Sequence, residues 1–175
     1  ILDISNPNIP IILSSNNFTY GKAWDIEVIG DIAYIADHSV GLTIIDISNP
    51  SSPTLLSNTK TNKWAVNIEI IGDIAYIADL SEGLTLINIS NPNSPILISN
   101  ITTSYAQDVK VVEDIAYIAD GTSGLTIIDV SNPSTPTKLS NVKCYARSVA
   151  IFNNIAFLVD NYLTIIDVSN PSIPI

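Results

Sequence analysis

The stretch Gly41-Leu-Thr-Ile-Ile-Asp-Ile-Ser-Asn-Pro50 decides the fold of this chain, because close copies of it recur along the sequence. The copies occupy residues 83–92, 124–133 and 163–171. Tyr162 precedes the last copy, where the other copies have glycine, and the tail of the motif also opens the chain. A segment that recurs at a fixed period predicts one supersecondary unit that stacks on copies of itself. The sequence is therefore informative about architecture and says little about a ligand.

The residues around the motif predict four short strands in each unit. Residues 23–29 alternate apolar with polar, which is the period of a β-strand. Gly30-Asp31 then forms a two-residue turn that needs a positive φ at its first residue, and residues 32–37 form the second strand. The motif is the third strand, and the fourth follows the turn Ser-Asn-Pro-x-x-Pro. In the third unit this hairpin turn begins with Glu113, which disfavours a positive φ.

The repeat divides the chain into four units within one segment, residues 1–175. The units span approximately residues 20–58, 62–100, 103–141 and 143–175. Four-stranded units of about 40 to 45 residues arranged radially are the blades of a β-propeller. Apolar residues make up 46% of the chain and charged residues 14%, so the inner strands must be covered on both faces. We therefore expect an all-β chain, a β-propeller with four blades of four antiparallel strands.

The two ends of the sequence have the same phase within the repeat. Residues 1–11 match residues 165–175, so residues 1–15 are either the end of a preceding blade or the closing strand of a ring. We favour the first interpretation, in which the chain is a piece of a larger propeller or repeat array. The chain has no methionine and no signal peptide at its start, as expected for an excised or mature piece. A closed four-bladed ring and a dimer sharing one eight-bladed ring are the alternatives.

Three short patterns carry a family resemblance: Ala-x-Asp-Val/Ile, then Ile-Ala-Tyr-Ile-Ala-Asp as at residues 115–120, then Gly-Leu-Thr-Ile-Ile-Asp-Val-Ser-Asn-Pro as at residues 124–133. Together they resemble the LVIVD repeat, a propeller-type repeat of bacterial and archaeal surface or secreted proteins. The resemblance covers essentially the whole chain. It implies an extracytoplasmic β-propeller, located outside the cell or on its surface, and it offers no common catalytic motif.

Charge and cysteine content exclude several classes of function. The net charge of −10 argues against binding to nucleic acid or to an anionic lipid surface. No apolar run approaches the roughly 18 residues of a membrane helix, so no membrane span is expected in this segment. Cys144 is the single cysteine, which excludes an intrachain disulfide and a cysteine-based zinc site.

Acidic residues recur at two positions of the unit and raise the question of a metal. They are Asp37, Asp79, Asp120 and Asp160 after the second strand, and Asp46, Asn88, Asp129 and Asp167 in the third strand. Repeated carboxylates suit calcium. A calcium loop, however, clusters several acids in one unit, and none of the units does so. We expect no cofactor and expect these side chains to hydrogen-bond their own turns, with calcium or another cation as the alternative.

Two further sets of residues are the candidate binding site. Asp25, Asn67, Asp108 and Ser148 start the innermost strand of each blade, where they either form a polar ring around a water or cation or tie neighbouring blades together. Tyr20, Trp24, Trp64, Tyr105 and Tyr145 lie in the loops that enter this strand. Aromatic side chains at a propeller mouth stack on sugars or grip a peptide, or they fill the wedge between blades.

No constellation of catalytic residues is visible in the sequence. His38 is the single histidine, it lies in a variable turn, and no nucleophile can be assigned to it. We predict a non-catalytic binding or scaffolding module of a cell-surface or secreted protein, with a protein or glycan at its loop face. The alternatives are a structural building block of an extracellular assembly, such as a surface layer or filament joined through blade edges, and an enzyme with a channel-bound cation.

Overall fold

The computed structural model describes residues 1–18 and 22–175, and all regular secondary structure in these residues is antiparallel β-sheet. The first sheet contains β3 (Ala23–Ile29), β4 (Ile32–Asp37), β5 (Gly41–Asp46) and β6 (Thr54–Lys60). The second contains β7 (Asn67–Ile71), β8 (Ile74–Ala78), β9 (Leu84–Asn88) and β10 (Ile96–Ile101). The third contains β11 (Asp108–Val112), β12 (Ile115–Ala119), β13 (Leu125–Asp129) and β14 (Thr137–Val142). The fourth contains β15 (Ser148–Phe152), β16 (Ile155–Val159) and β17 (Leu163–Asp167), and a separate hairpin pairs β1 (Leu2–Asp3) with β2 (Ile11–Ile12).

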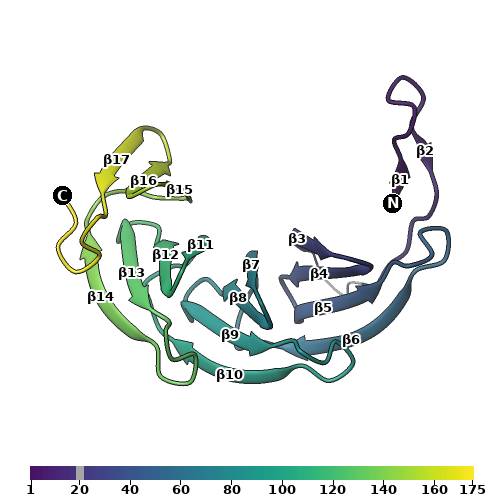
Figure 1. Ribbon diagram of the computed structural model, residues 1–175, viewed down its shortest axis with the longest axis horizontal. Coiled ribbons are helices and arrows are strands. Elements are labelled where there is room, and N and C mark those ends of the chain that lie inside the picture. The colour runs from purple at the N-terminus through teal and green to yellow at the C-terminus, as the bar shows by residue number, and fades with distance from the viewer. Residues whose placement is uncertain (19–21) are drawn as a thin grey trace.

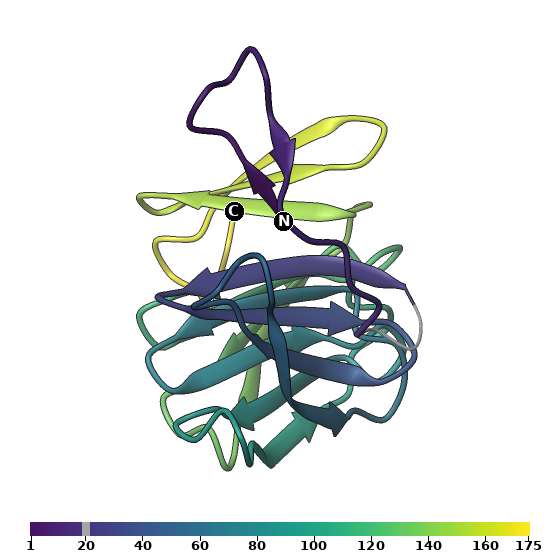
Figure 2. The ribbon, with the colours of Figure 1, turned by 90° about the vertical axis from the view of Figure 1, so that its right-hand side faces the viewer.

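The sheets stand side by side in an arc, and the arc is not closed into a ring (Figure 1). The first strand of each sheet, β3, β7, β11 or β15, lies toward the hollow of the arc, and β6, β10 and β14 follow its outer side. Figure 2 views the molecule from the end at which the hairpin and the first sheet lie. The prediction of an all-β repeat chain is confirmed, and a closed four-bladed ring is not what the structure shows.

The fourth sheet has three strands, whereas four were expected. The backbones of Asp167 and Ile175 exchange two hydrogen bonds of 2.6 and 3.0 Å. In the third sheet the matching residues Asp129 and Thr137 form the first pair between β13 and β14. Ile175 therefore occupies the first position of an outer strand, and the described residues do not extend that strand further.

Apolar contacts between neighbouring sheets form the core. Leu42 and Ile44 of the first sheet pack against Ile68 and Ile77 of the second, and all four side chains are fully buried. The same contact is repeated between the second and third sheets and between the third and fourth. Because each inner sheet is covered on both faces, its middle strands are continuous apolar runs without alternation.

Serine side chains on the outer side add one hydrogen bond between successive units. In each case the hydroxyl donates to the proline carbonyl in the turn of the next unit, over 2.6 to 2.7 Å. The pairs are Ser14 with Pro50, Ser57 with Pro92, Ser99 with Pro133, and Ser140 with Pro171. Ser14 directly follows β2. The segment after the N-terminal hairpin is therefore joined to the turn of the first sheet in the same way that Ser57 of β6 is joined to the turn of the second sheet.

The turn between the first two strands of each unit has the positive φ that the sequence indicated. Its first residue has φ of 56° at Gly30, 58° at Gly72, 53° at Glu113 and 52° at Asn153. Glu113 thus adopts a left-handed conformation that costs an L-residue roughly 1 to 2 kcal/mol.

Replacing Glu113 by glycine should raise the free energy of unfolding by about 1 kcal/mol, because the relieved backbone strain exceeds the added chain entropy of glycine. Glu82→Gly is the matched control, since Glu82 is also a turn glutamate but is not among the residues with positive φ. Urea denaturation followed by circular dichroism measures both variants. A loss of stability in Glu113→Gly equal to that in Glu82→Gly would contradict the strain argument.

Candidate functional site

The polar residues at the start of the first strands bind neighbouring units to one another. The Asp25 carboxylate accepts hydrogen bonds from the Asn67 side chain (2.7 Å) and the Ile68 amide (3.1 Å) of the next unit. The side-chain amide oxygen of Asn67 accepts a hydrogen bond from the Val109 backbone amide at 3.0 Å. The structure thus brings Asp25 together with Asn67 and places all of these groups at unit boundaries.

The next boundary repeats this arrangement. The Asp108 carboxylate accepts hydrogen bonds from the Ser148 hydroxyl at 2.6 Å and from the Val149 amide at 2.8 Å. Ser148 itself is exposed, since no further unit follows it in the arc. These hydrogen bonds join neighbouring units. This was one of the two roles expected for these side chains, the other being a polar ring around a water or cation. Within residues 1–18 and 22–175, no group of three or more His, Cys, Asp or Glu side chains is arranged to hold a metal ion.

Asp79 and Asp120, after the second strands of the second and third units, bind beyond their own turns, whereas Asp37 accepts a hydrogen bond from the Ser39 amide of its own turn at 3.2 Å. The buried Asp120 carboxylate accepts hydrogen bonds from the amides of Ser104 and Tyr105 and from the hydroxyls of Thr103 and Thr126. It therefore fixes the loop that leads into β11. Asp79 makes the equivalent bonds to Thr61, Lys63 and Thr85. Burial raises the pKa of the Asp79 carboxyl, because desolvation outweighs these hydrogen bonds.

The acids of the third strands behave as expected, because each accepts a hydrogen bond from the amide two residues later. Asp46, Asp129 and Asp167 bind the amides of Ser48, Ser131 and Ser169 over 2.8 to 2.9 Å. These bonds to serine lower the pKa of all three carboxyls. These side chains shape the Ser-Asn-Pro turns and take no part in the candidate binding surface.

Four aromatic side chains lie exposed at one face of the arc. They are Trp24, Trp64, Tyr105 and Tyr145, and between 43% and 63% of each remains accessible to solvent. The alanine that follows each of the last three, at positions 65, 106 and 146, is buried at the boundary between units. Tyr20, the fifth aromatic residue expected here, lies outside the described residues.

These aromatic side chains line two adjoining pockets. The first, of about 370 Å³, is bounded by Trp24, His38, Trp64, Val66, Leu80, Tyr105, Gln107 and Arg147. The second, of about 630 Å³, is bounded by Ser104, Tyr105, Gln107, Gly121, Thr122, Tyr145, Ala146, Arg147, Asp160 and Asn161. Because Tyr105, Gln107 and Arg147 line both, the pockets form one continuous depression, which we call the aromatic groove.

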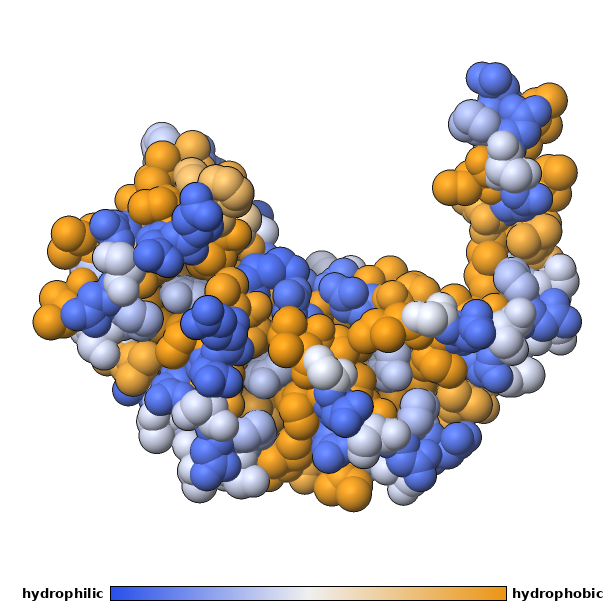
Figure 3. Space-filling view, viewed as in Figure 1, coloured by the Kyte–Doolittle hydropathy of each residue, from blue (hydrophilic) through white to orange (hydrophobic). Residues whose placement is uncertain are grey.

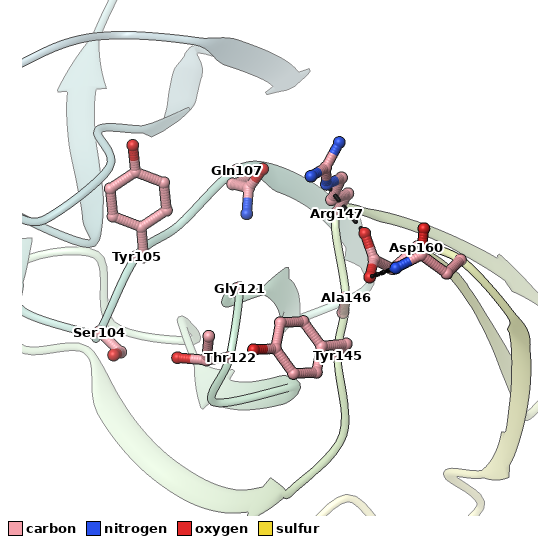
Figure 4. A pocket seen from close by; sticks show the side chains of 10 residues that line it. Ser104, Tyr105, Gln107, Gly121, Thr122, Tyr145, Ala146, Arg147 and Asp160 are labelled. Carbon is pink, nitrogen blue, oxygen red and sulfur yellow. Dashed lines mark hydrogen bonds and ion pairs between the residues drawn. The ribbon is translucent and has the colours of Figure 1, made fainter.

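Two polar side chains of the aromatic groove, Arg147 and Asp160, form an ion pair. Figure 4 shows Tyr105 and Tyr145 on either side of Gly121 and Thr122, with the pair formed by Arg147 and Asp160 beyond them. The Arg147 Nε lies 2.8 Å from an Asp160 carboxylate oxygen, although the arginine side chain is 75% exposed. Backbone hydrogen bonds between Gly121 and Ala146 fix the floor between the third and fourth units.

Sequence reasoning missed His38, which the structure places inside the aromatic groove. Its ring is stacked between Trp64, at 4.8 Å between ring centroids, and Trp24, at 5.9 Å. The imidazole therefore joins aromatic side chains of the first two units into one stack. The available signal was positional, since His38 directly follows Asp37 just as the groove residues Gly121 and Asn161 follow Asp120 and Asp160.

A second missed feature lies on the innermost strands, where Glu27, Glu69 and Lys110 occupy the same position of successive units. Lys110 forms an ion pair with Glu69. Burial lowers the pKa of Lys110, but the hydrogen bond to Glu69 reverses this and leaves the pKa raised. Burial and the neighbouring Glu69 charge both raise the pKa of Glu27. The cluster combines both signs of charge and lines neither pocket of the aromatic groove.

Comparison with protein families assigns the repeat. The model of the LVIVD repeat matches residues 20–61, 64–103, 104–144 and 143–175. The chain belongs to the LVIVD repeat family. The resemblance of its short patterns to that family is therefore confirmed, and the second and third matches begin at Trp64 and one residue before Tyr105. Trp24 was expected in a loop but lies in β3.

Two solved structures with a similar fold are those of computationally designed proteins. The crystal structure of the Ika4 protein has a TM-score of 0.65 and 12% identity, over 86% of this LVIVD repeat chain and 92% of the other chain. That of the Ika8 protein has a TM-score of 0.66 and 8% identity, over 85% of this chain and 46% of the other, so this chain spans less than half of Ika8. At these identities the likeness concerns the fold alone. A comparison with curated proteins found no match.

The described residues contain no helix with the length and apolarity needed to cross a membrane.

Proposed function

We propose that this LVIVD repeat chain is a β-propeller-type, non-catalytic binding and scaffolding module of a cell-surface or secreted protein, and that the aromatic groove is its contact surface. The observation that supports this most directly is the exposure of one large aromatic side chain per unit along a continuous depression. The small alanines beside them fill the boundaries between units, so the aromatic rings are not needed there for packing.

The chemistry of the groove fits an extended, uncharged ligand. Indole and phenol rings stack on the apolar faces of sugar rings or of peptide side chains. Gln107, Thr122 and Arg147 provide hydrogen-bonding groups among these rings, which is the combination found in ligand sites. A net charge of −10 disfavours polyanionic ligands. A glycan or a neutral polypeptide segment is the ligand class that we propose.

The test uses the tryptophan fluorescence of the whole chain, since Trp24 and Trp64 both line the groove. Oligomers of β-linked glucose and of N-acetylglucosamine, and neutral extended peptides, are titrated as probes. Replacing Trp64 and Tyr105 together by alanine should weaken binding of any probe that binds by at least about tenfold, as expected for central aromatic contacts. Tyr162→Ala is the matched control, because Tyr162 is an exposed tyrosine outside the groove. Equal binding by both variants would contradict the groove as the binding surface.

A scaffolding role has separate support from the ends of the arc. Both ends expose large hydrophobic side chains, in the hairpin and first sheet and in the fourth sheet. Figure 3 shows hydrophobic residues on the surface at both ends. Such surfaces on a soluble protein mark sites of association.

A further inference from the structure

The fourth sheet exposes residues that are buried at every other position of the repeat. Leu163 is 62% exposed, whereas the matching Leu42, Leu84 and Leu125 are fully buried. Ile165 is 58% exposed, whereas the matching Ile44, Leu86 and Ile127 are fully buried. In the other three sheets these side chains contact the next sheet along the arc. We call the surface formed by Val159, Leu163 and Ile165 the C-face.

The first sheet exposes the complementary surface. Ile26 is 56% exposed, whereas the matching Ile68 and Val109 are fully buried and Val149 is 2% exposed. Beside it lies a hollow of about 140 Å³ whose lining includes Phe18, Ile35 and Ile45. In the other three sheets the residues matching Ile26 contact the preceding sheet. Ile35 and Ile45 are 9% and 7% exposed, because Phe18 and Ile47 pack against them. We call the surface formed by Ile26, Ile35 and Ile45, which displacement of Phe18 would open, the N-face.

The chain already contains three contacts between a C-type and an N-type face. Leu125 and Ile127 of the third sheet pack against Val149 and Leu158 of the fourth, for example. The C-face and the N-face carry the same kinds of apolar side chains as these internal contacts. They differ from them in lying at the ends of the arc. A C-face and an N-face from different molecules therefore have the side chains needed to repeat a contact that this fold makes within itself.

Strand pairing supports the same conclusion. Within residues 1–18 and 22–175, the outer edge of β17 is paired only at Asp167, through Ile175. At the other end of this part of the chain, β2 is an outer strand whose only partner is the two-residue β1. The pair Asp3 and Ile11 matches the pair Asp167 and Ile175, so β1 occupies the position that β17 of a preceding unit would take. One end has a sheet that lacks most of its outer strand, and the other has an outer strand that lacks its sheet.

We propose that the C-face binds the N-face of a second copy of this chain, with β17 of one copy replacing β1 of the other and pairing with β2. Residues 1–10 and Phe18 are displaced. Leu2 and Ile4 are already 55% and 70% exposed, and the surface of Ile35 and Ile45 that Phe18 uncovers is covered again by the C-face of the second copy. Both ends of the arc point toward its open side (Figure 1), so a second arc that faces it meets both ends at once. The contact is heterologous and closes with two copies. Trp24 of the aromatic groove borders the N-face, since it lines a pocket with Ile26 and Ile35. Trp64 and Tyr105, the residues changed in the binding test, do not line that pocket, so the two proposals can fail independently.

The first measurement is the mass of residues 1–175 in solution, by light scattering on a size-exclusion column at protein concentrations up to 100 micromolar. The expected mass is that of two copies. Ile165→Lys should convert it to one copy without loss of folding, because this side chain is largely exposed in a single copy. Ile96→Lys is the control, since Ile96 is 65% exposed on β10, away from both ends. A single-copy mass for the unaltered chain, or equal masses for both variants, would overturn the proposal.

A cross-link tests the strand exchange itself. By the register of β13 with β14, where Thr126 pairs with Asn141, the exchanged strand places Ser15 of one copy opposite Thr164 of the other. In a single copy these residues lie at opposite ends of the arc. Ser15→Cys combined with Thr164→Cys, in a Cys144→Ala background, should form a two-copy disulfide species on a non-reducing gel. A variant that carries only one of these two cysteines should not form the disulfide that joins positions 15 and 164 of different copies. A two-copy mass without the cross-link in the double variant would overturn the exchange.

Discussion

Gly124→Ala is expected to lower the free energy of unfolding by about 3 kcal/mol or more. Gly124 has φ of +83°, and a Cβ atom built on it would lie 2.2 Å from the Val142 carbonyl oxygen and 2.5 Å from the Cys144 amide nitrogen. Both atoms belong to the backbone at the end of β14, so the outer strand must move away from β13. The strain of a positive φ adds to the cost of this displacement.

Tyr162→Ala is the matched control for Gly124→Ala. Tyr162 occupies the same position of the fourth unit and is 82% exposed, and no outer strand passes beside it in the structure. Its replacement should have little effect on stability. Urea denaturation followed by circular dichroism compares the two. If Gly124→Ala lost no more stability than Tyr162→Ala, the close approach of the outer strand would not be what requires glycine.

The strands and hairpin turns could be predicted from sequence because their determinants are local. Alternating polarity over residues 23–29 matches β3, and Gly30 and Asn153 have the positive φ that their turns require. Glu113 adopts the same conformation against its own preference. There the pairing of β11 with β12, supported by the packed core, outweighs the preference of one residue.

The contacts between units could not be predicted in the same way. Asp25 binds the Ile68 amide 43 residues further along the chain, and His38 stacks on Trp64 of the next unit. Such contacts depend on the rotation between successive sheets, which no local pattern encodes. The sequence therefore indicated which residues repeat, but it left open whether Asp25 and Asp108 face a channel ligand or the neighbouring unit.

The open shape of the arc could not be predicted from local sequence patterns either. Each sheet contacts only its neighbours, so the repeat specifies the contact between two units and not the number of units in a ring. Tyr162 is a local departure from the motif at the position where glycine lets the outer strand approach in the other three units.

Asp120→Ala is expected to cost about 3 kcal/mol of folding free energy, because it leaves the buried Thr126 hydroxyl and three partly buried hydrogen bonds of the preceding loop without their acceptor. The Asp120 side chain is 1% exposed, and its carboxylate accepts hydrogen bonds from the Tyr105 amide at 2.6 Å, the Thr103 hydroxyl at 2.7 Å and the Ser104 amide at 3.1 Å. Loss of these bonds also releases the loop that carries Tyr105, which lines both pockets of the aromatic groove.

Asp129→Ala separates this effect from a general loss of negative charge. The Asp129 side chain is half-buried and its carboxylate accepts one solvent-exposed turn hydrogen bond, from the Ser131 amide at 2.9 Å, so its replacement should cost far less stability. Urea denaturation gives the free energies, and hydrogen exchange of the Tyr105 amide reports on the loop. We expect faster exchange at Tyr105 in Asp120→Ala alone, under conditions in which the variant remains folded. Equal exchange in both variants would mean that Asp120 supports the fold without positioning the groove, and the aromatic side chains would then owe their placement to the backbone bridges between units.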